Sequence, residues 1–277
     1  MLSTYFLRSI PRFSVKKNTR LYLAGLIIIL GALSLVLFIV FSSGKNKVPK
    51  STAVSNEVLD EIYRKLHSAP GSARSIAFDL LNMDPEVITI VNRIELLRHI
   101  GTSFAMEENY LEALSYYSKA LDLAEEIMDL YQIASLNNNI GIINKEIRNY
   151  NNAIAHHTRA LELFLQLGQK EKVFRSYNNL GLLYMVLDMQ ERSLEYLHMA
   201  LEGSSAMHDT IATCAALGNI SSALLARGET DSAYQYINQA IELSKTSHNQ
   251  YSLCLSLRYL GNLEMAEKNY RNAYEAY

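Results

Sequence analysis

The sequence repeats with a period of 40 residues, and this period limits the folds open to the chain. A small residue that follows Ile or Leu recurs five times with this spacing, at Gly101, Gly141, Gly181, Ser221 and Gly261. In the first unit it is followed by two alanines seven residues apart, Ala113 and Ala120, and this pair also recurs in later units. Internal repeats of about 20–50 residues are typical of solenoids, propellers and arrays.

The apolar residues within each unit follow helical spacing. In the first unit Leu97, Ile100 and Phe104 lie at i, i+3 and i+7, and a second helical stretch begins after the polar tetrapeptide MEEN at 106–109. Neither helix can bury its apolar face alone, so neighbouring hairpins must stack on one another. We therefore expect small residues where two helices cross closely, and an all-α solenoid of helical hairpins.

This pattern resembles the tetratricopeptide repeat family. The resemblance rests on the LG or IG pairs, the two alanine positions and turn tyrosines such as Tyr110 and Tyr150, and it covers residues 94–277 in five repeats, the last incomplete. The usual family unit has about 34 residues, so a 40-residue unit is similar to the longer repeats of kinesin light chains and bacterial signalling proteins. The resemblance implies a right-handed solenoid; Ser193 and Ser221 are mild departures at small positions.

The N-terminal part of the chain has a different composition. Residues 21–41 form an uncharged apolar run of 21 residues, which as a helix would span roughly 30 Å and predicts one transmembrane helix. A cleaved signal peptide is the alternative, although its apolar region is usually about 7–15 residues long. Five Lys or Arg precede the run and three follow it. This excess predicts a cytoplasmic N-terminus and extracytoplasmic repeats, which would be periplasmic in a bacterium.

These features predict five regions along the chain. We expect a basic N-terminal segment at 1–20, the transmembrane helix at 21–41, a linker at 42–57, a degenerate helical capping unit at 58–93 and the repeats at 94–277. Because the sequence stops inside the second helix of the fifth unit, we expect it to be a fragment of a longer protein.

Charge and motifs exclude several classes of function. The first 50 residues carry eight basic residues and no acid, whereas the rest carries 18 basic and 28 acidic residues, and an acidic body disfavours nucleic-acid binding. No glycine-rich phosphate loop, HExxH or G-x-S-x-G motif is present, so we expect no enzyme, no cofactor and no small-molecule substrate.

Histidine and cysteine also favour structural roles. The adjacent His156 and His157 lack the further ligands that a metal site needs, and His157 occupies the packing position of Tyr117 in its own repeat. We therefore expect packing and no bound metal. Cys214 and Cys254 lie 40 residues apart, too far in a stacked array for a disulfide, and we expect both to be buried.

The concave face formed by the first helix of each repeat is the predicted binding surface. An amide side chain offers both a donor and an acceptor, so a row of asparagines at 40-residue spacing can hold the main chain of an extended peptide, and the family resemblance supports this role. Arginines beside the row would pair with acidic groups of the ligand. The alternative is that the asparagines bond only to neighbouring helices or water. The predicted peptide-binding residues are Arg98, Asn138, Asn139, Arg175, Asn178, Asn179, Asn219 and Arg258.

Together these features predict a membrane-anchored scaffold that binds a protein or peptide. One alternative is the sensory region of a signal-transduction protein, a histidine kinase or transcriptional regulator, whose effector domain follows residue 277. A weaker alternative is a structural assembly factor in an envelope complex.

Overall fold

The computed structural model describes residues 56–82 and 88–276. They belong to a compact unit that spans Thr52–Tyr277; a second unit, Met1–Ser51, lies outside the described residues. The regular elements of the described ranges are all α-helices, as expected from the repeat. In chain order they are α2 (Asn56–Ser68), α3 (Pro70–Leu81), α4 (Ile90–Met106), α5 (Tyr110–Glu126), α6 (Leu130–Glu146), α7 (Tyr150–Gln166), α8 (Lys170–Val186), α9 (Gln190–Ala206), α10 (Thr210–Ala226), α11 (Thr230–Thr246), α12 (Gln250–Ala266) and α13 (Tyr270–Ala276).

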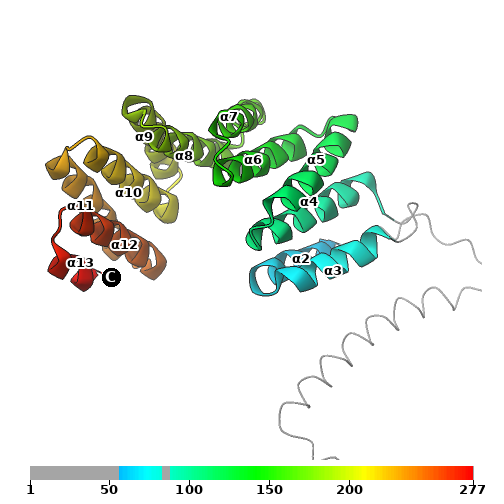
Figure 1. Cartoon of the computed structure of the whole chain (residues 1–277), viewed down its shortest axis with the longest axis horizontal. Helices are drawn as coiled ribbons and strands as arrows, with labels where there is room; N and C mark the ends of the chain where they lie inside the picture. The colour runs from blue at the N-terminus through cyan, green and yellow to red at the C-terminus, as the bar shows by residue number, and fades with distance from the viewer. Residues whose placement is uncertain (1–55, 83–87, 277) are drawn as a thin grey trace, which may run out of the picture. The chain divides into compact units, whose positions relative to one another are not determined.

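The helices from α4 onward follow a strict 20-residue rhythm. Each of α4 to α12 has 17 residues and begins 20 positions after the previous one. We call α4, α6, α8, α10 and α12 the first helices of the repeats, and α5, α7, α9, α11 and α13 the second helices. Figure 1 shows these hairpins following one another in chain order. The 40-residue sequence period therefore corresponds to one antiparallel helical hairpin.

Each three-residue turn places its middle residue in the left-handed backbone region. Seven of these residues are not glycine, among them Met128 with φ 55°, whereas Gly168 and Gly228 occupy the same place in two other turns. The next amide then closes a Schellman-type bond onto the preceding helix, as in Asp129 N–H to Ala124 O at 3.0 Å. The repeat, and not glycine, defines most of these turns.

The recurring small residues lie where the two helices of a hairpin cross, as predicted. An added Cβ at Gly101 would lie 2.7 Å from the Tyr117 ring, and one at Gly181 would lie 2.7 Å from Leu197. Ser221 stands in for glycine in the fourth repeat, and its hydroxyl donates to Ala233 O at 2.8 Å. A serine is tolerated at this crossing because its hydroxyl is hydrogen-bonded.

The two cysteines differ, so the prediction that both are buried is wrong for one of them. Cys214 is buried against α11, where its thiol lies 3.3 Å from the Ser244 hydroxyl and 3.5 Å from Ala240 O. Cys254 is exposed and is also free. Cys214 is covered by residues far along the 17-residue helix α11, whereas the helix that follows α12 in the described residues is the seven-residue α13.

The N-terminal hairpin, α2 and α3, begins at Asn56, two residues before the segment 58–93 that was expected to cap the repeats. Pro70 begins α3, where its missing N–H costs nothing, and the hydroxyl of Ser103 on α4 donates to Pro70 O at 2.7 Å. Across residues 56–82 and 88–276, no helix has both the length and the apolar character required to cross a bilayer. The predicted transmembrane helix at 21–41 lies outside the described residues.

Candidate peptide-binding pocket

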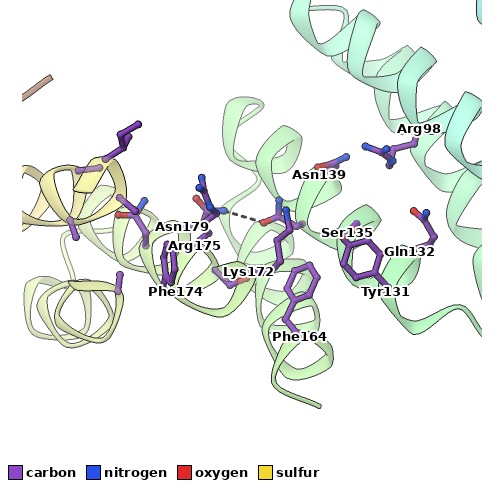
Figure 2. Close-up of a pocket in the computed structure, with 18 of the residues that line it drawn as sticks. Arg98, Tyr131, Gln132, Ser135, Asn139, Phe164, Lys172, Phe174, Arg175 and Asn179 are labelled. Carbon is purple, nitrogen blue, oxygen red and sulfur yellow. Dashed lines mark hydrogen bonds between the residues drawn. The ribbon is translucent and has the colours of Figure 1, made fainter. Parts of the chain in front are cut away.

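A pocket of about 500 Å³ lies over the first helices from α4 to α10 (Figure 2), and we call it the first-helix pocket. Residues from four consecutive repeats form its wall, with smaller contributions from the second helices α7 and α9. Its lining residues are Glu95, Arg98, Tyr131, Gln132, Ser135, Asn138, Asn139, Phe164, Lys172, Phe174, Arg175, Ser176, Asn178, Asn179, Ala200, Ile211, Ala212, Ala215 and Ala216.

Six of the eight predicted binding residues line this pocket. They are Arg98, Asn138, Asn139, Arg175, Asn178 and Asn179. Asn219 and Arg258 do not line it. Asn219 is 5% exposed, and Arg258 is an exposed residue whose guanidinium lies 5.9 Å from the centre of the Tyr259 ring.

The asparagines form a ladder between neighbouring first helices. Asn179 Nδ2 donates to Asn138 Oδ1 at 3.1 Å, and Asn219 Nδ2 donates to Asn178 Oδ1 at 2.8 Å. Tyr259 then closes the ladder by donating its hydroxyl to Asn219 Oδ1 at 2.7 Å. The side chain of Asn219 thus bonds to neighbouring first helices through both its nitrogen and its oxygen.

The remaining asparagines keep hydrogen-bonding capacity toward the pocket. Asn138 and Asn178 each use only the side-chain oxygen in the ladder, and Asn179 uses only an amide hydrogen. Asn139, half-buried, makes no side-chain hydrogen bond to any other described residue. Free amide donors and acceptors on two adjacent helices suit a ligand main chain.

One wall of the pocket is aromatic. The rings of Tyr131 on α6 and Phe164 on α7 lie 6.2 Å apart, centre to centre, in an edge-to-face arrangement, and Figure 2 shows both beside Lys172. Phe174 on α8 is 2% exposed. Helix α10 lines the same pocket with the small residues Ala212, Ala215 and Ala216. The pocket can therefore hold an apolar side chain next to polar groups.

Three cations line the pocket of an otherwise acidic body, and they differ in their partners. Arg98 forms an ion pair with Glu95. Arg175, about half exposed, lies 3.1 Å from Glu171 and 3.5 Å from Asp209, and exposed pairs of this kind contribute little stability. Lys172 forms no ion pair with any described residue. The cationic end of the pocket at α8 is thus open to an acidic ligand group.

A polar cluster around Glu95 forms the opposite end of the pocket. The Glu95 carboxylate accepts hydrogen bonds from Arg98 and Gln132. Burial acts to raise the pKa of Glu95, but the Arg98 charge and these hydrogen bonds outweigh it, so the pKa is lowered. Arg98 Nε and Gln132 Oε1 are buried without a partner, although buried polar atoms are usually hydrogen-bonded. Such orphaned atoms are characteristic of a site that is completed by a ligand or water.

Several lining residues were missed by the sequence analysis although a signal for them existed. The predicted row contained Asn139 and Asn179 but omitted the residues seven positions earlier, Gln132 and Lys172. Residues at i−4 and i−7 share a helix face, so the row extends toward the start of each helix. Following that stripe would have found Gln132, Lys172, Ser135 and Glu95.

The paired histidines of the third helical hairpin have structural environments. His157 is 1% exposed and packs against Gly141, where an added Cβ would lie 2.9 Å from the ring. Burial lowers its pKa to about 4, so the ring is neutral at pH 7. His156 Nδ1 lies 2.9 Å from Asn137 Oδ1. No group of three metal-ligating side chains occurs in the described part of the chain.

Two stretches of the sequence match models of the tetratricopeptide repeat, residues 92–166 and residues 215–247. The first stretch corresponds closely to the hairpins α4–α5 and α6–α7, and the second covers most of α10 and α11. No curated protein sequence matches the chain.

The fold is similar to several solved structures. A Rap protein complexed with competence and sporulation factor is 16% identical, with a TM-score of 0.60 over 80% of this chain and 73% of that one. NprR in complex with its cognate peptide NprX is 13% identical, with a TM-score of 0.62 over 95% and 77%. A STAND protein with a tetratricopeptide repeat sensor from Pyrococcus horikoshii is 16% identical, with a TM-score of 0.64 over 79% and 35%. The chain thus contains tetratricopeptide repeats within an all-α helical-repeat solenoid.

Proposed function

We propose that this protein is a binding scaffold that holds an extended peptide, or an extended segment of a protein, in the first-helix pocket. The observation that carries this proposal is the convergence of free amide groups, an unpaired cation and an aromatic wall in one pocket of about 500 Å³. Binding sites commonly combine an apolar lining with a few placed polar groups.

The spacing of the amide groups suits a peptide main chain. Asn179 on α8 and Asn138 on α6 meet at 3.1 Å, so the amide groups of these two first helices form one continuous row. An extended chain, which advances about 3.3 Å per residue, can run along such a row. Asn138 and Asn139 on α6 and Asn178 and Asn179 on α8 would each face a peptide bond, while Lys172 and Arg175 would pair with an acidic group.

Two of the similar structures support a peptide ligand. One is a Rap protein with competence and sporulation factor, and the other is NprR with its cognate peptide. We further propose that the chain acts by binding and not by catalysis, because the pocket places no nucleophile beside a base.

A peptide library tests the proposal. The full-length protein, purified in mild detergent because of its apolar segment, is exposed to a soluble library of random octapeptides, and retained peptides are sequenced by mass spectrometry. We expect a narrow set of sequences to be enriched. Replacing Asn138, Asn139 and Asn179 together by alanine should weaken binding of those peptides at least tenfold.

The matched control changes Asn151 and Asn152 to alanine. Both are exposed on the second helix α7 and do not line the pocket, so binding should be unchanged. An unenriched library, or equal weakening by both sets of substitutions, would contradict the proposal.

We also propose that residues 21–41 anchor the scaffold in a membrane with the repeats on the extracytoplasmic side. The test places a single cysteine in the linker, as in Ser51→Cys, after the exposed Cys254 has been changed to serine; the buried Cys214 can stay. Labelling by a membrane-impermeant thiol reagent in intact cells is expected. Extraction of the protein by carbonate, or labelling only after lysis, would contradict it.

A second candidate function is sensing for an effector domain encoded after residue 277. It is favoured by the similarity to a STAND protein whose tetratricopeptide repeats form its sensor. Reading the gene past codon 277 distinguishes this candidate: an in-frame kinase, ATPase or DNA-binding domain supports it, and an immediate stop codon refutes it.

A further inference from the structure

A second pocket, of about 370 Å³, lies between the N-terminal hairpin and the first repeat. We call it the N-terminal pocket. Helix α2 contributes Leu59, Asp60 and Tyr63, and helix α4 contributes Val91, Asn92, Glu95, Arg98 and His99. Glu95 and Arg98 line this pocket and the first-helix pocket alike. The two pockets therefore adjoin at α4, and a ligand that follows the first helices past Arg98 reaches the N-terminal pocket.

The N-terminal pocket has the opposite charge to the cationic end of the first-helix pocket at α8. Asp60 is exposed and forms no ion pair with a described residue, and the charge of Arg98 is already matched by Glu95. The pocket thus carries one uncompensated carboxylate. The Tyr63 side chain beside it is 54% exposed, and an exposed aromatic face attracts cations.

His99 adds an independent sign of a missing partner. The residue is 4% exposed, and its Nδ1 atom has no hydrogen-bond partner. Burial, together with the Arg98 charge, lowers its pKa to about 4, so the ring is neutral at pH 7. Its Nε2 atom lies 3.7 Å from the Glu95 carboxylate, which favours the proton on Nε2 and leaves a lone pair on Nδ1. The ring therefore adds an unused acceptor and no positive charge to the lining of the pocket.

We propose that the ligand is a peptide with a defined polarity: a basic group in the N-terminal pocket, near Asp60 and His99, and an acidic group near Lys172. This inference rests on the proposed peptide-binding function and names the ligand class. Asp60 lies on α2 and Lys172 on α8, so the basic and the acidic group should lie at opposite ends of an extended peptide. The basic group is a Lys or Arg side chain or a free amino terminus.

The octapeptide selection tests this polarity when it is read for position. With the unmodified protein we expect enriched sequences to carry Lys, Arg or the free amino terminus toward one end and Asp, Glu or the free carboxylate toward the other, always in the same order. An N-acetylated library distinguishes the sources of the cation. If the amino terminus supplies it, acetylation abolishes enrichment of peptides without Lys or Arg; if side chains supply it, the same sequences are retained.

Two charge reversals assign each end of the peptide. Asp60→Lys should weaken binding of the enriched peptides at least tenfold. It should also change the residues selected at that end of the peptide, and only there, from basic to acidic. Lys172→Glu should shift the other end from acidic to basic. Glu61→Lys is the matched control, because Glu61 is an exposed neighbour of Asp60 that pairs with Lys65 and lines neither pocket. It should leave the selection unchanged.

The outcomes distinguish the proposed polarity of the peptide from the proposed peptide-binding function on which it rests. Enrichment from the N-acetylated library of peptides that lack Lys and Arg, or an unaltered selection by the Asp60→Lys protein, would overturn the polarity while peptide binding stands. No enrichment by the unmodified protein would overturn both.

Discussion

The same structural position is open in one part of the solenoid and filled in another. Between α6 and α8 the paired positions are Asn138 and Asn179, whose side chains meet at the wall of the first-helix pocket. Between α10 and α12 the corresponding residues are Gly218 and Tyr259. The Tyr259 ring covers Gly218 so closely that an added Cβ would lie 2.3 Å from it. Below we call these the open junction and the closed junction.

This difference shows that the repeat determines where a residue lies in the fold, but not whether the space beside it is open or filled by a side chain. Both junctions have the same helix lengths and the same 40-residue spacing. At the open junction two short amides leave space and hydrogen-bonding groups. At the closed junction an aromatic ring fills the space, and its hydroxyl satisfies the last amide of the ladder. The first-helix pocket has lining residues on α10 but none on α12, where the closed junction lies.

The largest expected effect comes from converting the closed junction into the open one. Gly218→Asn alone should lower the free energy of unfolding by about 3 kcal/mol, because the new side chain overlaps the Tyr259 ring. Adding Tyr259→Asn should restore most of that loss by recreating the amide pair. Urea unfolding of the two single variants and the double variant measures the coupling. Additive losses would show that the junctions are not interchangeable.

The next effect concerns His157, a buried polar residue on α7 that packs against helix α6 of the open junction. His157 packs on Gly141 as Leu197 packs on Gly181. Its pKa is about 4 in the folded protein, against an ordinary value of 6.5. The unfolded chain therefore takes up a proton first, and stability is lost as the pH falls from about 6.5 toward 4. The expected loss from this residue between pH 7 and pH 5 is about 2 kcal/mol.

Replacing His157 by leucine checks this assignment. The variant should lose about 2 kcal/mol less than the unmodified protein between pH 7 and pH 5, leaving the contribution of the buried His99. Leucine reproduces the Leu197 packing and removes a buried ring nitrogen that has no partner. An unchanged pH dependence would show that His157 is not the group responsible.

A smaller effect tests the ladder itself. Asn178→Ala removes the acceptor of the bond from Asn219, a residue that is 5% exposed. We expect a loss of about 1–1.5 kcal/mol, because the Asn219 amide is left with an unmade bond. Asn139→Ala removes no intramolecular side-chain bond and should cost less than about 0.5 kcal/mol. Equal losses in thermal or chemical unfolding would argue against the ladder.

The smallest effect concerns the three-residue turns, whose middle residues share the same left-handed backbone conformation. Met128 has φ 55° and a side chain that is 81% exposed. Met128→Gly should stabilise the protein by about 0.5–1 kcal/mol, since glycine adopts this conformation without strain. The reverse change, Gly168→Met, should cost a similar amount. A destabilised Met128→Gly variant would mean that the entropy of the unfolded chain outweighs the relief of strain.

Much of the fold followed from the sequence because the repeat constrains it physically. Small residues at Gly101, Gly141 and Gly181 predicted the helix crossings, since only a missing side chain permits that approach. The polar tetrapeptide at 106–109 located the turn between α4 and α5, where Glu108 and not a glycine has the positive φ.

The site was less predictable for a different reason. The row of first-helix residues included Asn138 and Asn178, which line the pocket. The row could not show that the Asn219 side chain is already hydrogen-bonded to its neighbours, because that depends on how the Tyr259 ring packs on Gly218. Spacing specifies which residues share a face, whereas side-chain volume decides which of them a ligand can reach.

Photo-crosslinking is the most direct test of the central claim, that the peptide binds in the first-helix pocket. A benzophenone amino acid is placed at Ser135, which lines the pocket, or at the exposed Ser118 on α5, which does not. The account predicts that irradiation with the selected octapeptide gives a covalent adduct from position 135 and none from position 118. Adducts from position 118 alone would contradict it.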